Sequence, residues 1–272
     1  MRYASLTHPT GILTFDFHET VLLLLGFGKP STQPTSKKTH CHNNQAPKMS
    51  FYVYAFLLPK SSLVLPKGME KEVQLIPYQN LAAVTEADIS IEAIQETDEK
   101  LLEAVLNHDR VIREIFQQTS LLPLRFGNAF AAVENIINHL QNHQQQYLTT
   151  LTQLAEKAEY TVTFSPVSAP STLEIGQARG KAYLLAKKQR FQQQQAFQTE
   201  QRQQWENIRQ LIVQDYPKLV FKDCTEGGIK QVHLLANSEA EILTTQDLPK
   251  WQAECSHWQI SLSEALPPYH FV

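Results

Sequence analysis

Residues 51–58 read FYVYAFLL, and every residue in this stretch is apolar or aromatic. Successive side chains of a strand point to opposite faces, so Phe51, Val53, Ala55 and Leu57 share one face, and Tyr52, Tyr54, Phe56 and Leu58 share the other. Apolar side chains on both faces are typical of a strand that is covered on both sides. The stretch therefore predicts a strand inside an α/β domain.

Two further strands and a helix are predicted after this segment. Val73–Ile76 and Leu81–Val84 have strand-like composition, and Pro77 lies between them. Because proline cannot donate to a strand ladder, Pro77 predicts an interruption there. Residues 98–118 carry apolar side chains at alternating spacings of four and three, which predicts an amphipathic helix.

A second group of elements completes the predicted first domain. Residues 121–127, LLPLRFG, predict a short strand, and Asn128 is a suitable N-cap for the helix that should follow. A seam of apolar residues at alternating spacing runs from Val133 to Leu154 along that helix. Thr161–Phe164 predicts the strand that closes the first domain, and the proline-bounded residues 166–170 predict a linker.

The rest of the chain has a different order of elements. Gln177–Asp215 predicts a long, glutamine-rich helix, and residues 218–223 and 229–235 predict a hairpin around Gly227 and Gly228. A helix over Glu239–Cys255, bent before Pro249, and a strand over Trp258–Leu262 follow. Helix, strand, strand, helix, strand is the order of a ferredoxin-like sandwich that lacks or replaces its first strand.

We therefore predict an α+β protein with two domains and an N-terminal appendage. Residues 49–167 form an N-terminal α/β domain, and residues 168–272 form a C-terminal ferredoxin-like domain with a long extra helix. Residues 28–48 are rich in Pro, Ser, Thr, Asn and Lys, a composition that cannot bury enough apolar surface to fold. We expect residues 1–48 to be a disordered extension, or the result of a start assigned upstream of Met49.

Composition excludes several classes of function. Only 9 of 272 residues are glycine, which disfavours the glycine-rich loops that hold nucleotides. The formal net charge is −3, so no basic field is present to bind nucleic acid. The aliphatic run Val21–Leu25 is too short to span a membrane. Three cysteines without close spacing predict neither a disulfide framework nor a zinc ribbon, and they favour a reducing cytoplasm.

The sequence contains none of the catalytic and nucleotide-binding motifs GxGxxG, GxxxxGK[ST], HExxH and GxSxG. The best candidate for catalysis is His108 with Asp109, Arg113 and Arg125, since an imidazole beside a carboxylate can act as a general base. However, His108 falls on the apolar stripe of its helix, where a histidine is more often a hydrogen-bonded core residue. Asp109 and Arg113 have the spacing of an ordinary helical ion pair. We predict no catalytic residue and no cofactor.

Metal ligands are also considered and not predicted. His139 and His143 are four residues apart on one helix face, but no third ligand follows at the next turn, so a solvated pair is expected. His40 and His42 flank Cys41 in the predicted disordered segment, where a metal site is unexpected. Cys224 and Cys255 belong to no recognisable cysteine–histidine motif and are expected to be packing residues.

Three segments together resemble a known family. They are HDRVIREIFQQTSLLPLRFGNAF at 108–130, GQARGKAYLLAKK at 176–188 and ALPPYHFV at 265–272. They are similar to the gas vesicle protein F/L family, GvpF and GvpL, in which an LPLRFG-type strand follows a histidine-containing helix. A GxxYLxxK-type opening and a PPYxF terminus come later in that family, in the same order and at similar spacing. The resemblance covers residues 49–272.

The resemblance implies an accessory protein of gas vesicle formation that is not an enzyme. Such a protein would be a minor vesicle component inside the cytoplasm. It would bind the shell protein GvpA and other accessory gas vesicle proteins, and it would prevent GvpA from aggregating during nucleation and assembly. It would act in a chaperone-like way, with no membrane or nucleic acid as partner. The tentative residues for partner binding are Arg179, Lys181, Lys187, Lys188, Arg190, Tyr269 and Phe271.

Two alternatives remain open on the sequence alone. The chain could be a small-molecule-binding or catalytic α/β protein that uses His108, Asp109 and Arg125, because ferredoxin-like domains host many functions. The terminal residues 267–269, Pro-Pro-Tyr, could pin the tail to its own domain instead of binding a partner, because proline costs little entropy on ordering and the aromatic ring supplies burial.

Overall fold

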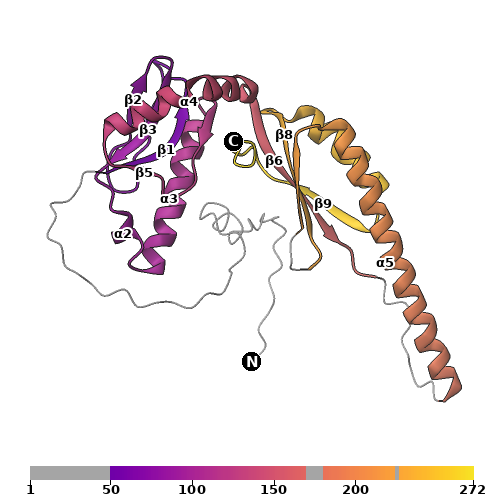
Figure 1. Cartoon of the computed structure of the whole chain (residues 1–272). Coiled ribbons are helices and arrows are strands. Elements are labelled where there is room, and N and C mark those ends of the chain that lie inside the picture. The colour runs from indigo at the N-terminus through magenta and orange to yellow at the C-terminus, as the bar shows by residue number, and fades with distance from the viewer. Residues whose placement is uncertain (1–49, 170–179, 224–226) are drawn as a thin grey trace, which may run out of the picture. The chain divides into compact units, whose positions relative to one another are not determined.

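The computed structural model describes residues 50–169, 180–223 and 227–272 (Figure 1). The described residues fall into two compact units, one of residues up to 119 and 124–144, the other of 120–123 and 145–272. Two antiparallel sheets are present, one mainly in each unit, and the short strand at 121–123 belongs to the first sheet. Each unit is described by itself. The predicted extension, residues 1–48, lies outside the described residues.

The first sheet has five strands. They are β1 (Phe51–Leu57), β2 (Gln74–Tyr78), β3 (Leu81–Ala87), β4 (Leu121–Pro123) and β5 (Ala129–Phe130). The order is β2-β3-β1-β4, and the short β5 also pairs with β1. Every residue of β1 is buried, which confirms that this strand is covered on both faces.

Two details of this sheet differ from the prediction. A bulge interrupts β1, because Val53 pairs with Thr85 while Ala55 pairs with Val84, which leaves Tyr54 as the extra residue. The strict alternation of two faces along β1 is therefore broken. The predicted interruption at Pro77 is wrong, since Pro77 lies inside β2. That strand is at the edge of the sheet, where a missing N–H costs no ladder bond.

Two helices follow the first three strands. The one-turn α2 covers Ile91–Ile94, and α3 covers Asp98–Phe116, close to the predicted helix. Thr97 is the N-cap of α3, and its hydroxyl accepts a hydrogen bond from the Lys100 N–H. Its buried face carries the apolar stripe that predicted the helix.

Helix α4 covers Val133–Leu154, so it begins where the apolar seam begins. The prediction that Asn128 is the N-cap of α4 is wrong, because β5 lies between Asn128 and the helix. The Asn128 side chain instead donates to the Arg125 carbonyl at 2.6 Å and stabilises the turn after β4.

The second sheet has four strands in the order β7-β8-β6-β9. Its elements are β6 (Lys157–Pro166), helix α5 (Lys181–Asp215), β7 (Leu219–Asp223), β8 (Lys230–Asn237) and β9 (Trp258–Leu262). The predicted hairpin is confirmed as β7 and β8, and β9 has its predicted bounds. The strand predicted over Thr161–Phe164 is part of β6. It pairs with β8 and β9, so assigning it to the first domain was wrong.

The last helical segment is bent as predicted, and the structure shows how. A π-helical turn, η1 (Leu243–Asp247), leads directly into α6 (Leu248–Glu254), which has Pro249 in its first turn. The widened turn accommodates a proline that has no N–H and would crowd the preceding turn. Trp251 of α6 is fully buried. None of the described helices has the combination of length and apolar character needed to cross a membrane.

Candidate functional sites

A buried network of hydrogen bonds surrounds His108 in the first unit. The Tyr52 hydroxyl donates to His108 Nδ1 over 2.7 Å, and His108 Nε2 donates to the Leu124 carbonyl over 3.0 Å. The Gly127 N–H donates to the Tyr52 oxygen at 3.2 Å. Tyr54 stacks on the imidazole, with ring centroids 5.4 Å apart. This network joins β1 and α3 to residues 122–127, LPLRFG.

The protonation state of His108 follows from this geometry. Desolvation lowers the pKa of His108 to about 4, although the bond to Leu124 and the charge of Asp109 favour the proton. The ring is therefore neutral near pH 7, and both of its nitrogens are occupied by protein groups. Because His108 has no exposed surface, it cannot reach a substrate. The geometry supports the core role that its place on the apolar stripe indicated.

The other members of the predicted catalytic group do not complete a site. Asp109 and Arg113 form the expected helical ion pair at 2.6 Å. Arg125 is exposed, on the turn after β4. His108, Asp109 and Arg125 thus do not meet at an accessible surface, and the structure does not favour the catalytic alternative.

A second buried polar centre, around Glu86, was missed in the sequence. Glu86 on β3 has no exposed surface, yet its carboxylate accepts hydrogen bonds from the N–H groups of Met69, Glu70 and Lys71 at 2.5–2.8 Å. The Tyr54 hydroxyl also donates to it. The loop therefore forms an anion-binding nest that the protein's own carboxylate fills. No side-chain motif signals it, because three of the four donors are backbone groups.

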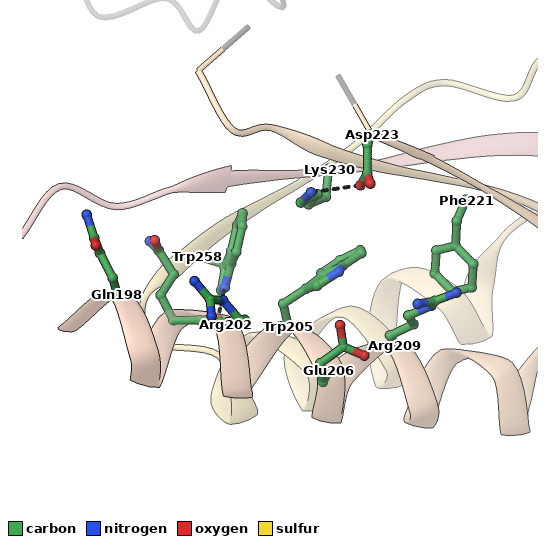
Figure 2. Close-up of a pocket in the computed structure, with 10 residues that line it drawn as sticks. Gln198, Arg202, Trp205, Glu206, Arg209, Phe221, Asp223, Lys230 and Trp258 are labelled. Atoms are coloured by element: carbon green, nitrogen blue, oxygen red, sulfur yellow. Dashed lines mark hydrogen bonds and ion pairs between the residues drawn. The ribbon is translucent and has the colours of Figure 1, made fainter. Parts of the chain in front are cut away.

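An open groove of about 680 Å³ lies between α5 and the sheet of the second unit (Figure 2). Its floor is aromatic. The Trp205 ring lies 5.8 Å from Trp258 and 6.1 Å from Phe221, measured between centroids. The Trp258 indole N–H donates to the Gln201 carbonyl, which ties β9 to α5.

The rim of this groove carries charges of both signs. Lys230 and Asp223 form an ion pair at 2.8 Å across the hairpin, and Arg209 lies 4.7 Å above the Phe221 ring. Figure 2 shows Arg202 and Glu206 on the same stretch of α5. Charges of both signs above packed aromatic rings do not form a recognisable catalytic arrangement. We therefore interpret the groove as part of the packing interface between α5 and the sheet.

The third polar centre is a cluster of Glu159, His233 and His270, which we call the carboxylate–histidine cluster. His270 Nδ1 lies 2.6 Å and His233 Nδ1 3.3 Å from the same oxygen, Oε1, of Glu159. The His270 backbone N–H donates to the other oxygen at 2.9 Å. The two imidazole rings are stacked, with centroids 3.7 Å apart. Sequence reasoning missed the cluster because its members come from β6, β8 and the C-terminal tail.

The cluster explains the position of the tail. Leu266 forms a bridge with Glu159, Pro267 and Pro268 are buried, and His270 is bonded to Glu159. Tyr269 and Phe271, two of the tentative partner-binding residues, are half-buried. The terminal residues thus pack on their own unit, and partner binding by Tyr269 and Phe271 stays a prediction.

The remaining tentative binding residues lie at the start of α5. Lys181, Lys187, Lys188 and Arg190 are exposed, and Arg179 lies outside the described residues. Exposed apolar side chains lie among them, notably Leu184 at 65% and Phe191 at 59%. Figure 1 shows this half of α5 continuing beyond the strands of its own unit. The first half of the helix thus presents a surface that the described residues of its unit leave exposed.

Two other candidate residues have ordinary roles. His143 Nδ1 donates to the His139 carbonyl within α4 at 2.9 Å, so one nitrogen of this pair is occupied by the helix itself. Cys255 is buried, and desolvation raises the pKa of its thiol to about 11, as expected for a packing residue. Cys224 lies outside the described residues.

Comparison with known families identifies the chain. The sequence model described as gas vesicle synthesis protein GvpL/GvpF matches residues 50–272. The chain belongs to this family. The resemblance seen in three sequence segments is therefore confirmed, and the GvpL/GvpF chain takes part in gas vesicle formation. No match was found among curated proteins.

Solved structures agree on the fold. The gas vesicle protein GvpF from Anabaena sp. PCC7120 aligns with a TM-score of 0.59 and 17% identity, over 82% of this chain and 97% of that one. GvpF from Microcystis aeruginosa aligns with a TM-score of 0.57 and 14% identity, over 82% and 98%. At these identities the likeness concerns the fold alone, an α/β structure with two antiparallel sheets.

Proposed function

We propose that this GvpL/GvpF chain is a non-catalytic accessory protein that binds the shell protein GvpA and limits its aggregation during vesicle nucleation and assembly. The observation that carries the proposal is the family match over residues 50–272. The buried, fully bonded state of His108 supports a role without catalysis. Under this proposal the protein works in the cytoplasm, at the growing vesicle.

We further propose that GvpA binds the first half of α5. From residue 181 to 196 every side chain is exposed except the half-buried Ala186. Leu184 and Phe191 are seven residues apart and so lie on the same face of the helix. A helix with exposed apolar side chains can insert them into a complementary groove of a partner. It can thereby shield apolar surface that a shell subunit exposes before assembly.

We also propose that the second unit is a ferredoxin-like domain. Its element order is strand, helix, strand, strand, helix, strand from β6 to β9. The first strand that the sequence prediction left absent is β6. This arrangement leaves α5 attached by its second half, through Trp205, Ile208 and Ile212, while its first half remains available.

The test is GvpA capture by full-length protein that carries Leu184→Ser and Phe191→Ser. We expect this double variant to lose most GvpA binding in a pull-down and to allow GvpA light scattering to rise as fast as in its absence. Its melting temperature should be unchanged, because neither side chain is buried. The matched control is Ile242→Ser, which removes a side chain of similar exposure, 63%, from another helix of the same unit. Equal capture by wild type, variant and control would refute α5 as the binding surface, and no capture by wild type would refute GvpA binding itself.

A further inference from the structure

The carboxylate–histidine cluster contains a buried negative charge that needs a cation. The Glu159 side chain is 1% exposed. Two imidazole nitrogens, His270 Nδ1 at 2.6 Å and His233 Nδ1 at 3.3 Å, face one of its carboxylate oxygens, and the His270 backbone N–H donates to the other. An ionised carboxylate in such a place requires a positive partner or several donors.

The histidines satisfy this requirement incompletely. His233 is buried, and its Nε2 has no hydrogen-bond partner. Its Nδ1 is shared between Glu159 and the Thr161 hydroxyl, which lies 3.0 Å away. A buried imidazole nitrogen without a partner costs about 1–3 kcal/mol. The nitrogen that faces Glu159 is Nδ1, which lies 3.3 Å from the carboxylate and 3.0 Å from the Thr161 hydroxyl, so Nδ1 is the nitrogen placed to bind an ion.

The donor set is that of a metal site. One atom from each of Glu159, His233 and His270 can be chosen so that all lie within 4.8 Å of one another, and no other such group occurs among residues 50–169, 180–223 and 227–272. Two imidazoles and a carboxylate are a common ligand set for zinc. We propose that Glu159, His233 and His270 bind a divalent transition-metal ion, Zn²⁺ by ligand chemistry, and that the ion attaches the C-terminal tail to the sheet.

Binding requires only a local rearrangement. Zinc bonds of about 2.0–2.1 Å in a tetrahedral site place ligand atoms about 3.3 Å apart. The distance from Glu159 Oε1 to His233 Nδ1 already has this value, at 3.3 Å, while that to His270 Nδ1 must open from 2.6 Å. The stacked rings must also splay. His270 can move because it lies on the tail and its side chain is 16% exposed, which also gives the ion a path of entry. Each ligating imidazole nitrogen must present its lone pair to the ion, with the ring proton on the other nitrogen.

The experiment titrates Zn²⁺, and Co²⁺ as a spectroscopic probe, into the full chain. All proteins carry His40→Gln, Cys41→Ser and His42→Gln, so that those residues do not compete. We expect one ion per chain, tetrahedral Co²⁺ absorption bands, and slower amide exchange in residues 266–272 when metal is present. His270→Gln should weaken binding about tenfold or more and abolish the exchange effect. This substitution lies on the tail and leaves the buried strands intact.

The matched control is His139→Gln with His143→Gln, which removes two histidines that share one helix face. We expect it to bind metal as the parent does. Metal binding that is equal in the His270→Gln protein and the parent would overturn the proposal. Absence of binding at millimolar Zn²⁺ would overturn it as well, and would leave the hydrogen bonds between His270 and Glu159 as the attachment of the tail.

Discussion

At the scale of single residues, His108 holds three parts of the first unit together, so we expect His108→Gln to destabilise it. Glutamine can replace at most one of the two bonds made by the ring, and either the Tyr52 hydroxyl or the Leu124 carbonyl then remains buried without a partner. The free energy of unfolding should fall by about 2–3 kcal/mol, measured by urea denaturation. Arg125→Gln is the control. This exposed residue belonged to the same predicted group, and its change should stay within about 0.5 kcal/mol.

The same histidine makes stability depend on pH. Its folded pKa, about 4, lies below the unfolded value near 6.5, so the unfolded chain binds more protons between these values. The stability present above pH 6.5 is therefore lost as pH falls toward 4, by about 3 kcal/mol in total. Denaturation of wild type and His108→Phe at several pH values measures this difference. Parallel pH profiles for the two proteins would contradict the prediction.

The nest around Glu86 predicts a severe effect at Gly68. A Cβ atom there would meet the Glu86 carboxylate and lie 2.7 Å from the Lys71 carbonyl oxygen, so Gly68→Ala must push the loop off the carboxylate. We expect a loss of about 2–4 kcal/mol in the free energy of unfolding, because buried donors and an acceptor lose partners. Gly127→Ala is a comparison at a glycine whose Cβ would meet nothing within 4 Å; its cost comes only from a backbone φ of 92°. If Gly68→Ala costs no more than Gly127→Ala, the close approach is not the cause.

These residues also show how far sequence reasoning reaches. His108 was predicted as a core residue because its helical spacing placed it among buried apolar positions. Glu86 was not recognised, since its partners Met69 and Lys71 donate through the backbone, which any residue type could supply. Glu159 and His270 are more than 100 positions apart, and only the tertiary fold brings them together.

At the scale of elements, the two halves of α5 should differ in dynamics. The second half is anchored by Trp205, Ile208 and Ile212, whereas side chains in 181–196 make no buried contact. Helices gain most of their stability from packing, so the first half depends on the propensity of its Gln, Lys and Leu residues. We expect fast amide exchange in 181–196 and slow exchange in 205–212, measured by mass spectrometry.

Adding GvpA tests the same difference in amide exchange between the two halves of α5. If GvpA lies on the first half of α5, its addition should slow exchange in 181–196 and leave 205–212 unchanged. Slow exchange throughout free α5 would contradict the description of its first half as unpacked.

Among the strands and helices, the errors have physical causes. The elements at 98–116, 133–154 and 258–262 were predicted because periodicity and composition agree there. The sequence located part of strand β6 but assigned it to the wrong sheet. Its partners β8 and β9 follow it by more than 60 residues, and no local sequence pattern predicts such a pairing. The bulge in β1 likewise depends on pairing with β3, and the all-apolar sequence of β1 contains no pattern that predicts it.

At the scale of the whole molecule, the net charge of −3 contrasts with the first half of α5. Residues 181–199 contain Lys181, Lys187, Lys188 and Arg190 and no acidic residue. An acidic protein that displays one acid-free cationic segment can attract an acidic patch of a partner there, and salt screens such exposed charges over about 8–10 Å. GvpA binding should therefore weaken several-fold between 50 and 300 mM NaCl.

Replacing the four cations by glutamine tests whether this segment causes the salt dependence. Glutamine keeps the helix propensity and the length of the side chains but removes the charge, so the variant should bind GvpA more weakly and with a flat response to NaCl. Lys157→Gln with Lys218→Gln removes exposed cations elsewhere in the same unit and should retain the wild-type slope. Affinity would be measured by biolayer interferometry. A quadruple variant with the wild-type slope would place the electrostatic contact outside α5, and binding would then rest on its apolar residues, Leu184 and Phe191.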